Sequence, residues 1–233
     1  EDWTYSDICV DFVCIYDGYE SVDNYIRDSH NGSLDVRLTS KDGGQILNGS
    51  TDWVLGAYWR EQDEALLRQY SFAAGDFVSD FKTSNRAIYA QLDSHLSSNL
   101  TLVTGLRLEN READYSDSEM IDHGVDEDLW GARVALQYRT ASGPMVYGLV
   151  SRGYKAGGIN SDPALDAVDR EFDTEQMWNI EGGVKGLWLD GSLQAQLAVF
   201  YQLRDDIQIK QSLVQPIDET NATSFTDYFG NAA

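Results

Sequence analysis

The chain has 233 residues and a formal net charge of −22, with only 3 prolines beside 20 glycines and 13 tyrosines. The excess of acids argues against a nucleic-acid partner and against attachment to anionic lipid through basic residues. The mean hydropathy of −0.40 and the lack of an apolar run of about 18 residues exclude a transmembrane helix, whereas the strands of a transmembrane barrel are apolar only at alternate positions.

Residues 1–30 are acidic and aromatic without a clear period, and they predict a loop region. The spacing of Cys9 and Cys14 allows a disulfide that closes a small loop in an oxidising compartment, and a pair of reduced thiols is the alternative. No histidine or further cysteine lies close by in the sequence, so no metal site is expected there. No signal peptide precedes this region, which indicates either a removed leader or a chain that begins inside its gene.

From residue 31 onward, polar and apolar residues alternate, as in strands with one apolar and one polar face. The clearest strand is 192–209, where Leu193 and Leu197 share one face while Gln194 and Gln196 share the other. Many of the strands exceed the usual length of about five or six residues. The alternation predicts about nine strands, which in chain order are 33–39, 52–62, 84–93, 99–113, 129–139, 144–155, 175–188, 192–209 and 223–229.

Two kinds of connection alternate strictly between these strands. In an up-and-down meander, alternate connections lie at opposite ends of the sheet, so the short turns gather at one end and the long, acidic loops at the other. The short turns are 97–99, 141–144 and 189–192, and the long polar segments are 63–82, 112–128, 156–173 and 210–222. The sequence therefore predicts an all-β protein, a transmembrane antiparallel up-and-down β-barrel in which one end carries most of the negative charge.

A soluble β-sandwich also alternates, but the strand lengths and the polar residues deep within strands favour a barrel with a wet interior. About nine strands cannot close a bacterial barrel, which has an even number, and open edges in lipid are unfavourable. The chain is therefore expected to be an incomplete set of strands. Aromatic residues near the strand ends suit interfacial belts, and these are Trp53, Tyr58, Trp59, Trp130, Tyr138, Tyr147, Trp178, Trp188 and Tyr201.

Residues 146–160 (VYGLVSRGYKAGGIN) closely resemble a barrel segment of TonB-dependent outer-membrane receptors. Residues 172–209 resemble the stretch that follows it in that family, with Glu175, Trp178, Glu181, Gly183, Lys185, Phe200, Tyr201, Asp206 and Gln208 at the family's motif positions. Residues 34–40, 52–62 and 100–112 resemble earlier strands of the same barrel. The similarity covers most of the chain from about residue 31.

The resemblance implies a place in the bacterial outer membrane and energy-coupled import of a scarce nutrient. The most common substrate in the family is a ferric siderophore, with haem, cobalamin and glycans as others. Residues 1–30 would be an extracellular loop region and 31–233 part of a single larger barrel. The partners implied are outer-membrane lipid, the small ligand, and TonB through a plug domain that this chain does not contain. No cofactor is implied.

Arg152, Tyr154, Lys155 and Trp178 are the candidate ligand-binding residues, as charged and aromatic groups expected at the lumen or at the base of the loops. The alternative is that they maintain barrel geometry and hydrogen bonding. The pair Gly157–Gly158 suggests a bend at a strand end.

No enzymatic constellation is evident. His30, His95 and His123 are far apart in the sequence, and no Gly-x-Ser-x-Gly nucleophile elbow occurs. No catalytic residues are therefore expected. The alternatives to a nutrient receptor are a passive porin or structural outer-membrane barrel and, third, a soluble carbohydrate-binding β-sandwich.

Overall fold

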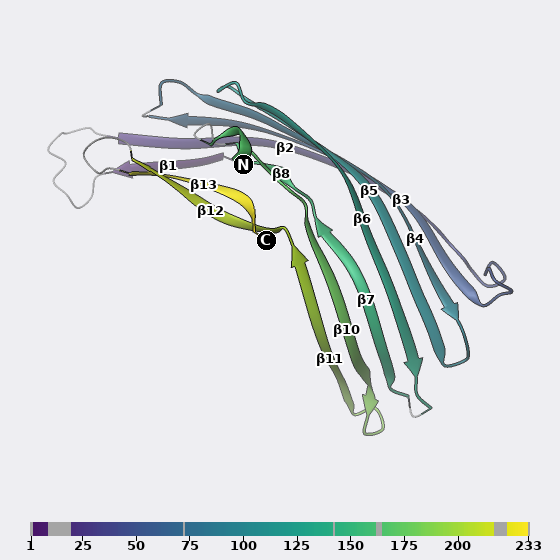
Figure 1. Ribbon diagram of the computed structural model, residues 1–233. Helices are drawn as coiled ribbons and strands as arrows, with labels where there is room; N and C mark the ends of the chain where they lie inside the picture. The colour runs from purple at the N-terminus through teal and green to yellow at the C-terminus, as the bar shows by residue number, and fades with distance from the viewer. Residues whose placement is uncertain are drawn as a thin grey trace.

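The computed structural model describes residues 2–8, 20–71, 73–141, 143–161, 165–216 and 223–232. Within these ranges, one antiparallel sheet dominates, and it curves into a trough (Figure 1). Its nine strands, in spatial order, are β1 (Asp2–Ile8), β2 (Glu20–Thr39), β3 (Thr51–Tyr70), β4 (Phe77–His95), β5 (Leu100–Asp117), β6 (Asp122–Arg139), β7 (Met145–Lys155), β10 (Glu175–Trp188) and β11 (Leu193–Asp205).

Two smaller sheets complete the described structure. β8 (Gly158–Ile159) pairs with β9 (Glu171–Phe172), and a single 3-10 turn, η1 (Ala167–Asp169), lies between them in the sequence. β12 (Ile207–Pro216) and β13 (Thr223–Ala232) form a separate hairpin. The described residues contain no helix long and apolar enough to cross a membrane.

The meander agrees with the expected fold class, because each strand of the large sheet pairs with its neighbour along the chain, and β10 follows β7 directly. The sheet remains open between β1 and β11. One predicted strand differs: 192–209 is divided between β11 and β12 at Asp206, whose φ of +54° interrupts the extended backbone.

Three of the segments predicted as long loops are strand over most of their described residues, and in one of them, 210–222, residues 210–216 belong to β12. Residues 63–82 belong mostly to β3 and β4, and the connection between them is only 71–76. Residues 112–128 belong mostly to β5 and β6, with 118–121 as the connection. These strand ends lack apolar alternation, and opposite charges such as Asp63 and Lys82 face each other across the ladder. A pair of strands that extends beyond the hydrocarbon layer needs no apolar face. Its sequence therefore lacks the alternation of apolar and polar residues, and it was predicted as a loop.

Residues 1–30 are also not a loop where the structure describes them. β1 pairs with β2 from Asp2 opposite Ile26 to Ile8 opposite Glu20, and β2 continues without a break to Thr39. Cys9 and Cys14 lie outside the described residues, so their pairing stays a prediction.

The two faces of the large sheet differ in burial. On β5 and β6, Val103 and Ala135 are 8% and 1% exposed, whereas Val134 and Leu136 on the other face are 51% and 46% exposed. Side chains on the concave face of a curved sheet crowd together, and those on the convex face spread apart. The apolar alternation therefore lies on the convex face, and the polar one lines the trough, as expected for a barrel with lipid outside and water inside.

Aromatic residues bound the apolar band of the convex face at two levels. The register places Trp59, Trp130 and Trp178 on neighbouring rungs toward one end of the strands, and Trp53, Tyr138 and Trp188 toward the other. The ten-residue separation on β10 is about 33 Å along the strand, or about 25 Å of height at a typical barrel tilt. That height matches the hydrocarbon layer of an outer membrane.

Two of the predicted belt residues point into the trough instead. Tyr147 donates a hydrogen bond from its hydroxyl to Glu181, and the Tyr58 ring lies 5.3 Å from the Arg107 guanidinium on the concave side. Both follow from the alternation, since each neighbours an outward-facing residue, Val146 or Trp59.

Candidate functional site

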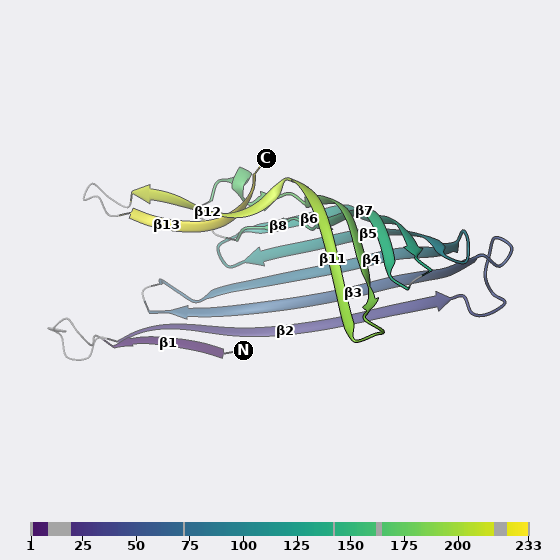
Figure 2. The ribbon, with the colours of Figure 1, turned by 90° about the horizontal axis from the view of Figure 1, so that it is seen from below.

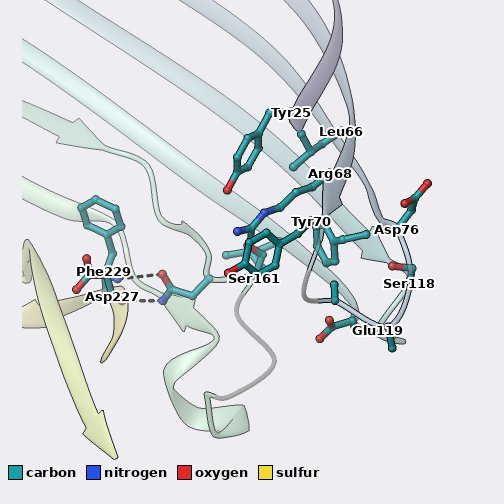
Figure 3. Close-up of a pocket in the computed structure, with 16 residues that line it drawn as sticks. Tyr25, Leu66, Arg68, Tyr70, Asp76, Ser118, Glu119, Ser161, Asp227 and Phe229 are labelled. Carbon is teal, nitrogen blue, oxygen red and sulfur yellow. Dashed lines mark hydrogen bonds between the residues drawn. The ribbon is translucent and has the colours of Figure 1, made fainter. Parts of the chain in front are cut away.

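A cavity of about 850 Å³ lies on the concave side, at the end of the trough where the β3–β4 and β5–β6 connections meet (Figure 3). We call it the mouth cavity. The β1–β2 pair and the β12–β13 hairpin lie on opposite sides of the trough at this end (Figure 2). The cavity is lined by Tyr25, Leu66, Arg68, Tyr70, Ala73, Ala74, Gly75, Asp76, Phe77, Ser118, Glu119, Ile159, Asn160, Ser161, Asp227 and Phe229.

An arginine held between two tyrosine rings forms one wall of the mouth cavity. Tyr25 and Arg68 lie directly opposite each other in the β2–β3 ladder, and Asp23 and Tyr70 form the next rung on the same face. The Arg68 guanidinium is 5.0 Å from the centre of the Tyr25 ring and 5.2 Å from that of Tyr70. Its Nε and Nη2 each donate to a different carboxylate oxygen of Asp23 at 2.8 Å. This fork-to-fork geometry holds both tyrosine rings in place at the cavity.

The carboxylates beside the cavity stay ionised at neutral pH. The hydrogen bond from Arg68 lowers the pKa of Asp23, and the hydrogen bond from Lys210 lowers the pKa of Asp227. A lowered pKa means that each pairing contributes fully above the ordinary pKa of an aspartate and is lost only as pH falls through the lowered value. The charges of Asp23 and Asp227 therefore do not change across the physiological range.

Asn160 fixes the opposite wall. Its Nδ2 donates to the backbone carbonyls of Asp169 and Phe229, both at 2.7 Å, and its Oδ1 accepts from the Phe229 N–H at 2.9 Å. The Phe229 ring packs against Phe172 with centres 5.7 Å apart. Through these hydrogen bonds, the buried amide of Asn160 links β13 to the segment that follows β7.

Gln208 and Glu175 connect the β11–β12 junction to β7 and β10. Gln208 Nε2 donates to the backbone carbonyls of Lys155, Ala156 and Asp173, at 3.2, 2.8 and 3.0 Å. Glu175 accepts from the Gln208 N–H at 3.0 Å and from the Arg204 guanidinium. Both side chains are buried, so two positions of the receptor-like motif serve to hold the β11–β12 junction against β7 and β10.

The four candidate ligand-binding residues lie outside the lining of the mouth cavity. Tyr154 is on the inner wall, where its hydroxyl donates to Glu109 at 2.7 Å and accepts from Arg107 at 3.3 Å. The Lys155 side chain is exposed, and its carbonyl is one of the acceptors of Gln208.

Arg152 and Trp178 lie at the convex belt instead. The Arg152 guanidinium is 3.9 Å from the centre of the Trp130 ring, and Trp130 meets Trp178 edge to face at 6.3 Å. The β6–β7 ladder ends at the rung of Ala132 and Arg152, and just beyond it Arg152 donates to the free Trp130 carbonyl. Arg152 is 8% exposed. It thus donates a hydrogen bond to a backbone carbonyl that has no ladder partner where β6 and β7 separate.

Replacing Arg152 by methionine is expected to lower the free energy of unfolding by about 2–3 kcal/mol, because a buried carbonyl and the Gln176 amide lose a charged donor. Ligand affinity of the folded fraction should stay unchanged. Denaturant unfolding and ligand titration of the full-length protein separate the two effects. Arg139→Met, at an exposed position, is the control. A selective loss of affinity in Arg152→Met would instead support the ligand role.

Sequence analysis missed the residues of the arginine wall, namely Asp23, Tyr25, Arg68 and Tyr70. These positions fell in segments predicted as loops, so no face was assigned to them. A usable signal existed, since Tyr25 and Asp23 alternate on one strand as Arg68 and Tyr70 do on the next.

The described residues contain no group of three or more histidine, cysteine, aspartate or glutamate side chains arranged to hold a metal ion. His123 pairs with Glu171 at 3.2 Å, and His95 pairs with Asp52 at 3.0 Å. Neither pair is among the residues that line the mouth cavity, so what the site offers is aromatic, amide and carboxylate groups for binding a ligand.

Comparison with known proteins agrees with this architecture. Residues 2–232 match the family model described as TonB dependent receptor-like, beta-barrel. The ferric yersiniabactin uptake receptor FyuA from Yersinia pestis is similar in structure, with a TM-score of 0.67 and 22% identity over 81% of this chain and 30% of that one. The siderophore receptor PiuA from Acinetobacter baumannii gives a TM-score of 0.61 and 15% identity, over 91% and 35%.

The copper transporter OprC is also similar, with a TM-score of 0.63 and 10% identity over 91% of this chain and 34% of that one. At these identities the likeness establishes the fold alone. The chain spans about a third of the length of each of these three structures.

Proposed function

Because the chain belongs to the β-barrel family of TonB-dependent receptors, which are bacterial outer-membrane proteins, we propose that it forms part of a receptor that imports a ferric siderophore. The mouth cavity would be one side of the ligand site. TonB would act through a plug domain supplied by another part of the receptor. The protein's role is binding and transport, and it requires no covalent chemistry.

The observation that carries this proposal is the position and composition of the mouth cavity. It is concave, it opens at the wet end of the trough, and its arginine wall holds two aromatic rings in fixed positions. Rigid aromatic faces beside a few placed polar groups are the usual make-up of a small-molecule site. A volume of about 850 Å³ suits a ligand of several hundred daltons.

Fold neighbours add support at the level of analogy. FyuA is named as an uptake receptor for ferric yersiniabactin and PiuA as a siderophore receptor, while OprC is named as a copper transporter. The soluble sandwich receives no support, since the nine-stranded sheet of the described residues carries its apolar side chains on the exposed convex face.

A transport experiment separates a receptor from a passive porin. The full-length receptor is expressed in a bacterial strain without its own siderophore receptors, and uptake of iron-55 from a set of ferric siderophores is followed. We expect uptake of at least one siderophore, saturable at micromolar concentration and abolished when TonB is deleted. Uptake that persists without TonB, or that never saturates, would favour the porin.

Tyr70→Leu is expected to weaken siderophore binding by about tenfold, because it removes a rigid aromatic face from the arginine wall. Tyr138→Leu is the matched control, since that tyrosine lies in the convex belt at the far end of the strands. Equilibrium binding to the purified full-length receptor provides the measurement. Equal affinities for the two variants would place the ligand elsewhere.

A further inference from the structure

The mouth cavity has an excess of negative charge. Among the described residues, its lining contains one cationic side chain, Arg68, against the three carboxylates of Asp76, Glu119 and Asp227. The segments outside the described ranges contain no lysine or arginine at all, so they add no cation to this balance.

The charge of Arg68 is already neutralised by a carboxylate. Its Nε and Nη2 both donate to Asp23, whose side chain is only 22% exposed. Withdrawing the guanidinium from Asp23 to bind an anion would leave that half-buried carboxylate unpaired, which is unfavourable. The pair as a whole presents the ligand with two tyrosine rings and no net charge.

The carboxylates differ in how far they are neutralised. Asp227 pairs with Lys210 at 2.6 Å. From the described part of the chain, Asp76 receives only an amide hydrogen bond, from Gln69 at 3.1 Å, so its charge remains. Glu119 is exposed, and the neighbouring Asp117 adds a further negative charge beside the cavity. The potential at the cavity is therefore negative even after each ion pair is counted.

The strand ends around the cavity add to this negative potential. Residues 112–128 carry eight acids and no lysine or arginine, and they form the projecting ends of β5 and β6 with their connection. Two of these acids, Glu112 and Glu127, pair with Arg86 and Arg111, so the remaining six supply the excess of negative charge. A concave site rimmed by charge of one sign repels ligands of that sign and concentrates those of the other.

We propose that the ferric chelate bound by the mouth cavity has no net negative charge, being either uncharged or cationic, and is held mainly against the rings of Tyr25 and Tyr70. This inference rests on the proposed function. An uncharged chelate gains the aromatic contact without repulsion, and a cationic group on it gains attraction to the tyrosine faces and to Asp76 and Glu119. A trianionic chelate of the same size is disfavoured by on the order of tenfold in affinity at low salt.

The test uses the full-length receptor in detergent and three ferric chelates of similar size. These are a neutral trihydroxamate, a trihydroxamate with one free ammonium group, and a triscatecholate of net charge −3. Dissociation constants are measured at about 50 mM and about 500 mM salt, where screening of exposed charges differs strongly. We expect the first two chelates to bind at least tenfold more tightly than the third at low salt, with a smaller ratio at high salt.

A charge-neutral double variant, Asp76→Asn with Glu119→Gln, should reduce this discrimination several-fold. The matched control, Asp42→Asn with Asp190→Asn, removes two carboxylates from connections at the opposite end of the strands and should leave it unchanged. Equal or tighter binding of the trianionic chelate would overturn the inference while leaving siderophore import intact. Binding of none of the three chelates would contradict the import function itself, and the inference with it.

Discussion

Replacing Val134 by arginine is expected to lower the free energy of unfolding in lipid by about 2–4 kcal/mol. Val134 lies midway between Trp130 and Tyr138 on the convex face of β6 and is 51% exposed in the isolated chain. An arginine at this depth must bring its charge into hydrocarbon or thin the membrane locally. Denaturant unfolding of the full-length receptor in lipid vesicles measures the effect.

Gln137→Arg is the control for Val134→Arg. Gln137 is on the same strand, and its rungs with Thr101 and Tyr147 place it on the concave face. The same charge added to a wet interior should change stability by less than about 1 kcal/mol. Equal losses for the two variants would mean that the convex face does not contact lipid.

The strands were predicted well inside the apolar band and poorly beyond it. Strands 144–155 and 175–188 were predicted close to their observed bounds, because inside the apolar band one face must be apolar and the other polar. Beyond the band both faces of the sheet are in water, so the alternation of apolar and polar residues disappears. The parts of β3 to β6 that continue there were therefore predicted as loops. The arginine wall of the mouth cavity lies beyond the band, so sequence analysis assigned Tyr25 and Arg68 to no face.

Arg152 illustrates a second limit. Sequence analysis expected Arg152 at the lumen or at the base of the loops, and nothing local in the sequence indicates that the β6–β7 ladder ends beside it. The hydrogen bonds of Asn160 and Gln208 could not be predicted from the sequence either, because each amide contacts backbone atoms more than 50 positions away. Such contacts between distant segments depend on the assembled sheet and not on any local pattern.

Tertiary contacts also explain why the motif containing Arg152 and Gly157 is recognisable although neither residue lines the mouth cavity. The motif lies where β7 leaves β6 and the chain turns toward the mouth cavity, and its residues satisfy backbone groups at that junction. A receptor can vary its ligand by changing the cavity walls while this junction stays the same.

Gly157 is the residue at that junction with the least room. Its N–H donates to Glu127 at 3.0 Å and its carbonyl accepts from Arg111 at 3.1 Å, so it lies between the partners of an ion pair that are each 13% exposed. A Cβ on Gly157 would lie 2.8 Å from the Glu127 carboxylate and closer still to the Phe172 carbonyl. Since backbone cannot yield as a flexible side chain can, the substitution must displace β9 or break the bonds to the ion pair.

Gly157→Ala is therefore expected to destabilise the full-length receptor by about 1–3 kcal/mol and to weaken ligand binding, because Asn160 and the far wall of the mouth cavity follow within three residues. Gly153→Ala, earlier on β7, places its Cβ where nothing lies within 4 Å and should be nearly neutral in both measurements. Denaturant midpoints and siderophore dissociation constants for the two variants provide the comparison. If the two alanines behaved alike, crowding at Gly157 would not be what positions the wall, and the hydrogen bonds of Asn160 would have to do so alone.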